Sequence, residues 1–267
     1  MANQQQSEQI RDQVRQHYSE IVQRSTGCCS SASCCGNYVQ DNALYQGLRL
    51  GYALEDLLAA PQGANISLGC GNPGAIAALC PGEVVLDLGC GGGLDCFLAA
   101  RQVGETGRVI GVDMTPDMLR QARENAAQIG LTNVEFRLGE IEHLPVADSS
   151  VDVIISNCVI NLSPDKEAVL REAYRVLRPG GRLAISDTVA TAPLPEEARR
   201  DMALWASCLS GAALIDDLEQ MLREAGFTQI RIRPKDESRE MIREWVPGCG
   251  VEEYVLSATI EAVKPIS

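Results

Sequence analysis

Between residues 83 and 190, short apolar runs alternate with amphipathic segments, and this alternation constrains the fold more than any other feature. The apolar runs are typical of strands, and they are Val84–Leu88, Arg108–Val112, Val134–Leu138, Val151–Ser156 and Arg182–Ser186. The segments between them predict helices at Leu94–Val103, Pro116–Ile129 and Asp165–Leu177. This order predicts an α/β fold, in which a Rossmann-like, doubly wound and mostly parallel sheet is covered by helices on both faces.

The segments on both sides of this core have a different character. Residues 7–24 carry an apolar stripe at helical spacing, whereas residues 25–37 are small and polar and predict a loop. Beyond residue 195 we expect helices at 195–208 and 216–225 and closing strands at Gln229–Arg233 and Tyr254–Ala262, with an antiparallel sheet edge as one option. Three regions follow: an N-terminal helix, cysteine-rich loop and connector over 1–80 that cover the active site, a ligand-binding Rossmann-like domain over 81–190, and a C-terminal α+β region over 191–267 that binds substrate.

Charge and cysteine content exclude several classes of protein. A net charge of −13 at pH 7 and an isoelectric point near 4.7 argue against nucleic acid and anionic membranes as partners. The first 24 residues lack the apolar core of a secretory signal, and no run of about 18 apolar residues occurs, so we expect a cytoplasmic location. Eleven irregularly spaced cysteines are then reduced thiols, available for metal binding, catalysis or packing.

The first predicted strand leads into the glycine-rich loop Asp87-Leu-Gly-Cys-Gly-Gly-Gly93, and the second ends at Asp113. Glycines let a ligand approach the backbone, and a carboxylate at Asp113 can accept both hydroxyls of a ribose. The dinucleotide fingerprint G-x-G-x-x-G would require a glycine at position 94, which is Leu94 here. Asp87 suits a ligand with an amino group better than one with a pyrophosphate. We therefore favour S-adenosylmethionine (AdoMet) over a dinucleotide.

Three cysteines lie in distinctive strings at predicted loops or turns. They are Cys70 in Leu68-Gly-Cys-Gly-Asn-Pro73, Cys158 in Ser156-Asn-Cys-Val-Ile-Asn-Leu162, and Cys208 in Ser207-Cys-Leu-Ser-Gly-Ala-Ala213. Cys158 follows the fourth strand and therefore falls at the crevice outside the carboxyl ends of the sheet. Three thiols facing a methyl donor suggest that the methyl acceptor is a soft, thiophilic atom.

The remaining cysteines carry weaker signals. The doublets Cys28-Cys29 and Cys34-Cys35 match no common zinc spacing. A free cysteine is most often a small buried hydrophobe, so we expect packing roles for four others, which are Cys80, Cys90, Cys96 and Cys249.

The glycine loop resembles that of class I AdoMet-dependent methyltransferases, whose hallmark is an acidic residue before Leu-Gly-x-Gly-x-Gly, and the resemblance spans about residues 80–190. It implies that Asp87, Gly89 and Gly91 hold the methionine end of AdoMet and that Asp113 binds its ribose. It also implies that the adenine is surrounded by Met114, Glu140 and Ile141. Asn157, next to Cys158, completes the expected cofactor-binding set.

The strings around the three cysteines are similar to those of the arsenite methyltransferases, and with the core the likeness covers most of residues 60–264. The resemblance implies that Cys70, Cys158 and Cys208 hold trivalent arsenic. It implies in addition that an N-terminal cysteine, Cys34 or Cys35, takes part in thiol exchange. The Tyr-Tyr-Gly-Cys-Gly string of eukaryotic members is Ser67-Leu-Gly-Cys-Gly71 here, so the form looks microbial.

The resemblance implies an enzyme of arsenic detoxification that methylates arsenite and methylarsenite, with AdoMet as co-substrate and without a permanent metal. Three sulfur ligands leave a lone pair on arsenic that can attack the methyl group, so no general base is needed, and we expect His17 and His143 at the surface. A second methylation needs two thiols, for which we choose Cys158 and Cys208. Arsenic would arrive as thiol conjugates, thioredoxin or glutathione would serve as reductant, and the protein would be a monomer.

Two other functions stay open. A methyltransferase for a carbon or oxygen acceptor, such as a sterol or quinone precursor, shares the cofactor core but needs no thiols. A non-catalytic, thiol-rich metalloid binder would carry a vestigial AdoMet site, against which the intact Asp87, Gly89, Gly91 and Asp113 argue. Activity on antimony also stays open.

Overall fold

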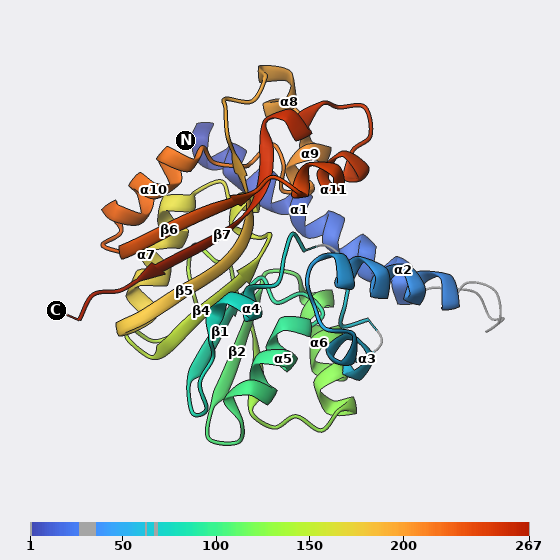
Figure 1. Ribbon diagram of the computed structural model, residues 1–267, viewed down its shortest axis with the longest axis vertical. Coiled ribbons are helices and arrows are strands. Elements are labelled where there is room, and N and C mark those ends of the chain that lie inside the picture. The colour runs from blue at the N-terminus through green and yellow to red at the C-terminus, as the bar shows by residue number, and fades with distance from the viewer. Residues whose placement is uncertain (1, 27–35, 62, 67–68, 267) are drawn as a thin grey trace.

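A seven-stranded sheet forms the centre of the computed structural model, which describes residues 2–26, 36–61, 63–66 and 69–266 (Figure 1). The strands are β1 (Val84–Leu88), β2 (Arg108–Asp113), β3 (Val134–Leu138), β4 (Val151–Asn157), β5 (Leu177–Ala190), β6 (Thr228–Lys235) and β7 (Val255–Val263). They lie in the order β3-β2-β1-β4-β5-β7-β6. Strands β1 to β5 are parallel to one another, and β7 is antiparallel to β5 and β6. The predicted mostly parallel sheet is confirmed, and its closing strands are antiparallel.

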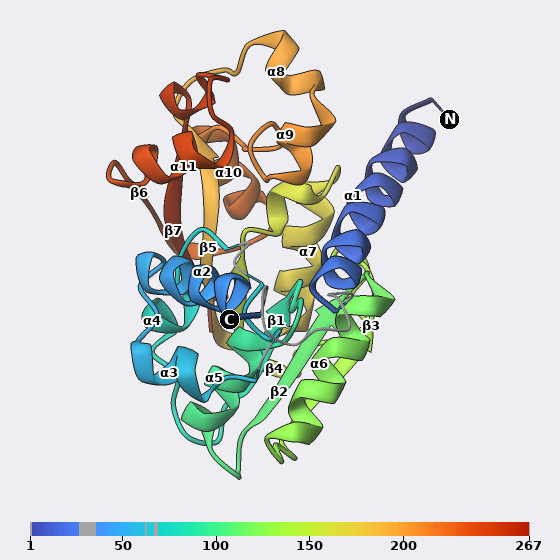
Figure 2. The ribbon, with the colours of Figure 1, turned by 90° about the vertical axis from the view of Figure 1, so that its right-hand side faces the viewer.

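Helices cover both faces of this sheet (Figure 2). They are α1 (Ala2–Thr26), α2 (Gly36–Arg49), α3 (Leu54–Ala59), α4 (Pro73–Ala77), α5 (Leu94–Val103), α6 (Pro116–Gln128), α7 (Lys166–Val176), α8 (Glu196–Arg200), α9 (Met202–Ala206), α10 (Ile215–Glu224) and α11 (Ser238–Trp245). Apolar residues of α4, α5 and α6 pack on one face, and those of α7 and α10 pack on the other. Among the described residues, no helix is both long and apolar enough to cross a membrane.

The central strands are buried on both sides, which explains why their sequences are apolar runs with little alternation. In β1, Leu86 and Leu88 point into one apolar cluster and Val85 points into the other. Successive side chains of a strand face opposite sides of the sheet, so both clusters draw on the same short run. Burial of one such aliphatic side chain contributes about 1.5–3 kcal/mol to folding.

Side-chain caps fix where three of the described helices begin, and Asp201 caps α9 by accepting hydrogen bonds from Ala203 N and Leu204 N. Asp165 accepts a hydrogen bond from Ala168 N at the start of α7, and Asn72 accepts one from Ala75 N at the start of α4. Such a cap contributes about 1 kcal/mol. Thr115 occupies the cap position of α6, as expected, but its side chain makes no cap hydrogen bond. The carboxylate of Asp113 accepts the Thr115 N–H instead, at 2.8 Å.

Two elements differ from the sequence-based expectation. The string Pro179-Gly-Gly181 was expected to separate a helix from a strand at 182–186, but β5 already begins at Leu177 and continues to Ala190. It extends because Leu177 pairs with Val151, and because residues 182–190 pair without interruption along β7. Helix α11 was not predicted, since charged residues dominate its sequence and only three of its side chains are buried, Ser238, Met241 and Ile242.

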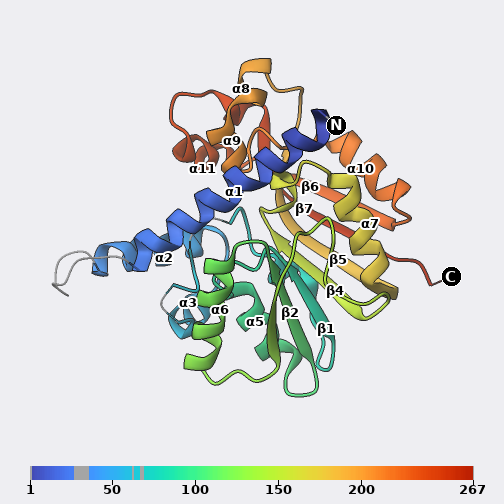
Figure 3. The same cartoon turned by 180° about the vertical axis from the view of Figure 1, so that it is seen from behind.

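Helix α1, predicted at residues 7–24, crosses the edge of the sheet where the parallel strands end (Figure 3). Arg11 Nε donates to Glu142 at 3.3 Å, and Tyr18 donates to the carbonyl oxygen of Ala206 at 3.4 Å. Ser19 donates to the carboxylate of Asp117 in the first turn of α6. These contacts anchor α1 across the carboxyl ends of the strands.

Candidate active site

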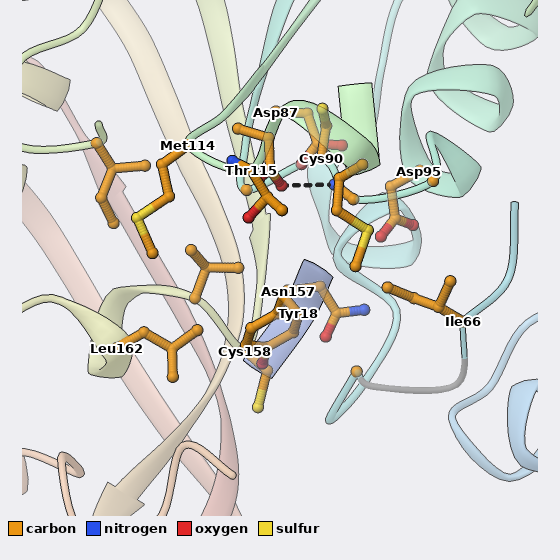
Figure 4. A pocket seen from close by; sticks show the side chains of 18 of the residues that line it. Tyr18, Ile66, Asp87, Cys90, Asp95, Met114, Thr115, Asn157, Cys158 and Leu162 are labelled. Carbon is orange, nitrogen blue, oxygen red and sulfur yellow. Dashed lines mark hydrogen bonds between the residues drawn. The ribbon is translucent and has the colours of Figure 1, made fainter. Parts of the chain in front are cut away.

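A cavity opens at the carboxyl ends of β1, β2 and β4, and α1 forms part of its wall (Figure 4). Its empty space, open solvent included, is about 1050 Å³. It lies at the crevice where the sequence places the ligand. Its lining includes seven of the eight residues predicted to bind the cofactor, which are Asp87, Gly89, Gly91, Asp113, Met114, Ile141 and Asn157.

The glycine loop after β1 passes closely against its surroundings. Gly89 and Gly91 have φ angles of +69° and +49°, in the left-handed region that side chains disfavour. A Cβ atom at Gly89 would lie 2.5 Å from the methyl carbons of Val159. Only glycine therefore fits at position 89, and the loop presents its backbone to the cavity.

Three carboxylates surround this loop, of which Asp87 and Asp113 are buried and Asp95 is partly buried. Burial raises the pKa of Asp87 well above its usual range, and it raises that of Asp95 to about 6. The pKa of Asp113 is also raised by burial. Negative charges that have lost water are stabilised by a positive ligand, and AdoMet carries an ammonium and a sulfonium. The donor set of the cavity therefore fits AdoMet.

Asp113 connects the two loops that line the cavity. Its Oδ2 accepts the Gly91 N–H at 2.9 Å, and its Oδ1 accepts the Thr115 N–H at 2.8 Å. A carboxylate oxygen has two lone pairs, so each oxygen keeps one for a ribose hydroxyl. The same side chain thus shapes the glycine loop and remains a hydrogen-bond acceptor for ligand.

Glu140 is the one residue of the predicted cofactor set that lies outside the cavity lining. Its carboxylate pairs with Arg15 Nη2 at 3.3 Å and with Arg11 Nε at 3.5 Å. The arginines of α1 hold it, because α1 packs beside the end of β3. Its neighbours Ile141 and Glu142 line the cavity instead.

The three cysteines of the distinctive strings come together. Cys70, Cys158 and Cys208 are each no more than 3% exposed and pack in one cluster with Val14 and Leu162. Cys208 Sγ donates to the carbonyl oxygen of Cys158 at 2.6 Å. The Cys158 thiol lies within hydrogen-bonding range of the other two thiols and lines the cavity, so the cluster reaches the cofactor cavity through Cys158.

Two of these cysteines have strained backbones. Cys158 and Cys208 have φ angles of +59° and +61°, in the left-handed region. Such a conformation costs about 1–3 kcal/mol for a residue other than glycine, and it persists only where the surroundings enforce it. Cys158 is held by its own N–H, which donates to Ser186 O at 2.8 Å. With this backbone conformation, both thiols lie in the same buried cluster.

The surroundings keep the thiols protonated. Burial raises the pKa of Cys70. The hydrogen bond from Cys158, together with burial, raises the pKa of Cys208 well above its usual range. For Cys158, the hydrogen bond with Cys208 lowers the pKa, but the one with Cys70 and burial outweigh it, so the net shift is strongly upward. The cluster therefore presents neutral thiols at pH 7.

Asp187 is a site residue that the sequence did not indicate. One of its oxygens lies within 4.8 Å of the sulfur atoms of both Cys70 and Cys158. It accepts N–H groups from Ile160 at 2.9 Å and from the Asn161 side chain at 2.8 Å, and burial raises its pKa to about 6. Its position between apolar runs at the end of a strand was the available signal.

Other lining residues were also missed, because they come from elements far away in the sequence. Tyr18 of α1 and Tyr52 before α3 line the cavity, as does Asp95 in the first turn of α5. Figure 4 shows Tyr18 at the cavity, where it packs against the cluster that contains Cys158. Tyr18 belongs to the apolar stripe of the helix predicted over residues 7–24. That stripe predicts that one face of the helix is buried, but it does not indicate which element the face packs against.

The remaining cysteines divide into three groups. Cys90 and Cys96 are buried, as predicted, whereas Cys80 and Cys249 are exposed, so the packing prediction is wrong for these two. Cys96 Sγ donates to Asp87 at 3.2 Å beneath the glycine loop. Cys34 and Cys35, predicted to exchange thiols, lie outside the described residues, as do Cys28 and Cys29.

Known proteins share this arrangement. The chain matches the family model described as a methyltransferase domain over residues 79–226. An arsenite methyltransferase of Halobacterium salinarum is 52% identical, over 97% of this chain and 67% of the relative. One from Aquipseudomonas alcaligenes is 41% identical, over 84% of this chain and 63% of the relative. The chain thus spans about two thirds of the length of these relatives.

A solved structure extends the likeness to three dimensions. The crystal structure of an arsenic(III) S-adenosylmethionine methyltransferase from Chlamydomonas reinhardtii has a TM-score of 0.61 and 37% identity, over 84% of this chain and 73% of that one. The chain belongs to the arsenite methyltransferase family, within the class I AdoMet-dependent methyltransferases.

Proposed function

We propose that this chain methylates trivalent arsenic, as arsenite and as methylarsenite, with AdoMet as the methyl donor. The observation that carries the proposal is the convergence of Cys70, Cys158 and Cys208 in one buried cluster at the edge of the cofactor cavity. Trivalent arsenic is a soft centre that prefers sulfur ligands. The named activity of the relatives supports the same substrate.

The thiols are suited to ligand exchange. Each As–S bond forms as a protein thiol gives up its proton, which leaves with the displaced group as water from an As–OH bond or as free thiol from a thiol conjugate. No base has to carry that proton away. Since the pKa values of all three cysteines are raised, the proton stays with sulfur until exchange occurs.

Bound to three sulfurs, arsenic keeps one lone pair for the attack on a methyl group. When bound, AdoMet supplies that electrophilic methyl group. The chain contributes position, because Cys158 belongs both to the thiol cluster and to the cavity wall. Holding both reactants in line removes much of the entropic barrier, and Val14, Leu162 and Tyr18 keep water from the thiols.

The later steps follow from the valence of arsenic. Methyl transfer makes arsenic pentavalent, and two thiols can return two electrons as they become a disulfide. Thioredoxin or glutathione would reopen that disulfide, with Cys34 or Cys35 in the exchange. Methylarsenite has one valence filled by carbon, so Cys158 and Cys208 suffice for it. We also propose that the protein acts as a monomer in a reducing cytoplasm, that it receives arsenic as thiol conjugates, and that it serves detoxification.

The rival functions lead to different site chemistry. A methyltransferase for a carbon or oxygen acceptor needs no thiols, yet three buried thiols and two strained cysteines are present. A non-catalytic metalloid binder would not need the carboxylates that surround the glycine loop. Antimony, which also binds thiols, remains a second substrate to test in the same assay.

The experiment is an incubation with arsenite, AdoMet and a reducing thiol, followed by separation of the arsenic products. We expect methylated arsenic from the wild type and none from Cys158→Ser. Cys80→Ser is the matched control, since Cys80 is an exposed thiol outside the cluster. Full activity of Cys158→Ser, or no methylated arsenic from the wild type, would contradict the proposal.

A further inference from the structure

Cys70 differs from the other two cysteines of the cluster in how it is held. Cys158 follows directly on β4 and Cys208 follows closely on α9, whereas residues 69–72 lie outside any helix or strand. A segment without regular structure has no ladder of backbone hydrogen bonds to fix it. The position of the Cys70 thiol therefore depends on side chains that grip its backbone.

Asn157, the last residue of β4, makes that grip. Its Oδ1 accepts the Cys70 N–H at 2.9 Å, and its Nδ2 donates to the Gly71 carbonyl oxygen at 2.7 Å. These two partners fix which amide atom is which, because a backbone N–H only donates and a carbonyl only accepts. The side chain thus binds the peptide group that precedes Cys70 and the peptide group that follows Gly71.

The segment also sits tightly on this amide. A Cβ atom at Gly69 would lie 2.6 Å from Asn157 Nδ2, and one at Gly71 would lie 2.7 Å from Ser186 Oγ. The glycines on both sides of Cys70 are therefore required for the approach. These close approaches are a physical reason why glycine stands on each side of Cys70 in the Gly-Cys-Gly string.

A second link leads from Asn157 to the cofactor side. Nδ2 also donates to the Tyr52 hydroxyl at 2.9 Å, and that hydroxyl donates to the Asp95 carboxylate at 2.8 Å. Both hydrogens of the Asn157 amide are then used within the protein, which leaves none to donate to a cofactor. Asp95 and Tyr52 line the cavity, and Tyr52 is buried.

We propose that Asn157 is a positioning residue for the Cys70 thiol. We call its two hydrogen bonds to the Cys70 segment the Asn157 latch, and we propose that Tyr52 couples this latch to Asp95 in the cofactor cavity. The role replaces the cofactor contact that the sequence suggested for Asn157. It rests on the proposed function, since it assigns a part of arsenic binding. The latch serves the first methylation above all, because arsenite takes three thiols and methylarsenite takes only Cys158 and Cys208.

The test compares two substrates in one variant. For Asn157→Ala, two lost hydrogen bonds to the Cys70 segment lower the initial rate with arsenite by about tenfold or more, whereas the rate with methylarsenite falls less than about threefold. Tyr52→Phe shifts the ratio of the two rates in the same direction by a smaller factor. AdoMet affinity, measured by calorimetry, changes less than the arsenite rate does.

Asn72→Ala is the matched control. Asn72 lies in the same connector and caps α4, but it does not contact the peptide groups of Cys70, so the ratio of the two rates stays at the wild-type value. A double variant, Cys70→Ser with Asn157→Ala, shows no further fall in that ratio beyond Cys70→Ser alone, because both changes act on one thiol.

Other outcomes separate the failure of this proposal from that of the proposed function. Equal losses with both substrates and a large loss of AdoMet affinity would make Asn157 a cofactor ligand and overturn the latch. Additive losses in the double variant would also overturn it. If the wild type methylated neither arsenic substrate, the proposed function itself would fail, before any variant is compared.

Discussion

The two sides of the active site are built in different ways. The cofactor side is made of the loop after β1, the start of α5 and the end of β2, which follow one another in the chain and are tied by bonds such as Gly91 N–H to Asp113. The thiol side draws Cys70, Cys158 and Cys208 from three segments that only the tertiary fold brings together. The cofactor side is built from residues that are close in the sequence, and the thiol side is built from residues that are far apart in it.

The difference shows in strain and in support. Positive φ angles on the cofactor side fall on glycines, which adopt them at little cost, whereas on the thiol side they fall on Cys158 and Cys208. The thiol side also depends on the Asn157 latch and on α1. We therefore expect changes on the thiol side to affect substrate chemistry with little effect on AdoMet, and changes on the cofactor side to affect both.

The largest expected effect comes from Cys208→Gly. Methylation of both arsenic substrates should fall by about a hundredfold or more. Arsenite would then keep two of its three sulfur ligands, and methylarsenite would keep one of its two. The free energy of unfolding should change by less than about 1 kcal/mol, since relief of the positive φ offsets the lost packing of one thiol. Product analysis and thermal denaturation measure the two effects.

Cys249→Ser, an exposed thiol outside the cluster, serves as its control. A Cys208→Gly variant that lost AdoMet affinity as well as arsenic methylation would break the comparison, because the thiol side would then support the cofactor side.

The second prediction concerns the cofactor side. Gly89→Ala should weaken AdoMet binding about tenfold or more, since the new Cβ would lie 2.5 Å from Val159 at a φ of +69°. Gly130→Ala is the matched control: its φ is +68°, but nothing lies within 4 Å of its Cβ position. Both variants should lose stability, and only Gly89→Ala should lose affinity in calorimetry. Equal affinities in the two would show that strain alone, and not the close approach, acts at position 89.

The contrast between the two sides also explains what the sequence could predict. The strands and the glycine loop are local patterns, so their positions follow from periodicity and from residue types. Cys158 could be placed by topology, because it follows a central strand. Cys70 and Cys208 could be placed only by resemblance, since no local pattern reports which distant segments meet.

The differences between expectation and structure have the same physical origin. Glu140 follows β3 at a position where a cofactor contact is reasonable, but arginines of α1, more than a hundred residues earlier in the chain, hold its carboxylate. Pro179-Gly-Gly181 has the composition of a turn, yet β5 pairs with β4 both before it, at Leu177, and after it, at Arg182, with a shift of register between them. Tertiary pairing overrides local preference at such positions. The hydrogen bond between Tyr52 and Asp95 was not predicted, because the sequence around each residue carries no signal that the two side chains meet.

The third prediction is a pH dependence of AdoMet binding. Burial raises the pKa of Asp95 to about 6, so the carboxylate gains a proton as the pH falls through that value. Its attraction for a cationic ligand is then lost, and affinity should fall severalfold between about pH 7.5 and 5.5. The stability of the ligand-free protein depends on pH in the opposite sense. Because the pKa of Asp95 is raised in the fold, the protonated form of Asp95 stabilises the folded state; this stabilisation is present below about pH 4 and lost as the pH rises through 6.

Because Asp187 has a pKa of about 6 as well, a variant has to assign the effect. Asp95→Asn should bind AdoMet more weakly at pH 7.5, and the part of the pH dependence that Asp95 causes should be lost. A pH dependence that persisted unchanged in Asp95→Asn would exclude Asp95 as its origin and leave the other buried carboxylates, Asp87 and Asp113 on the cofactor side and Asp187 on the thiol side.

The smallest expected effect tests the element that covers both sides, α1. Glu140→Gln removes partners of Arg11 and Arg15, whose side chains are 14% and 34% exposed, while Glu142 still pairs with Arg11. Partly exposed ion pairs contribute about 0.2–1 kcal/mol, so AdoMet dissociation in stopped-flow measurements should accelerate only about two- to threefold. Arg15→Ala should accelerate dissociation in the same direction but by less, because it breaks the Arg15–Glu140 pair and leaves the Arg11–Glu140 pair in place. If Glu140 contacted the adenine instead, Glu140→Gln would weaken AdoMet binding and Arg15→Ala would not, and the residue would return to the cofactor side.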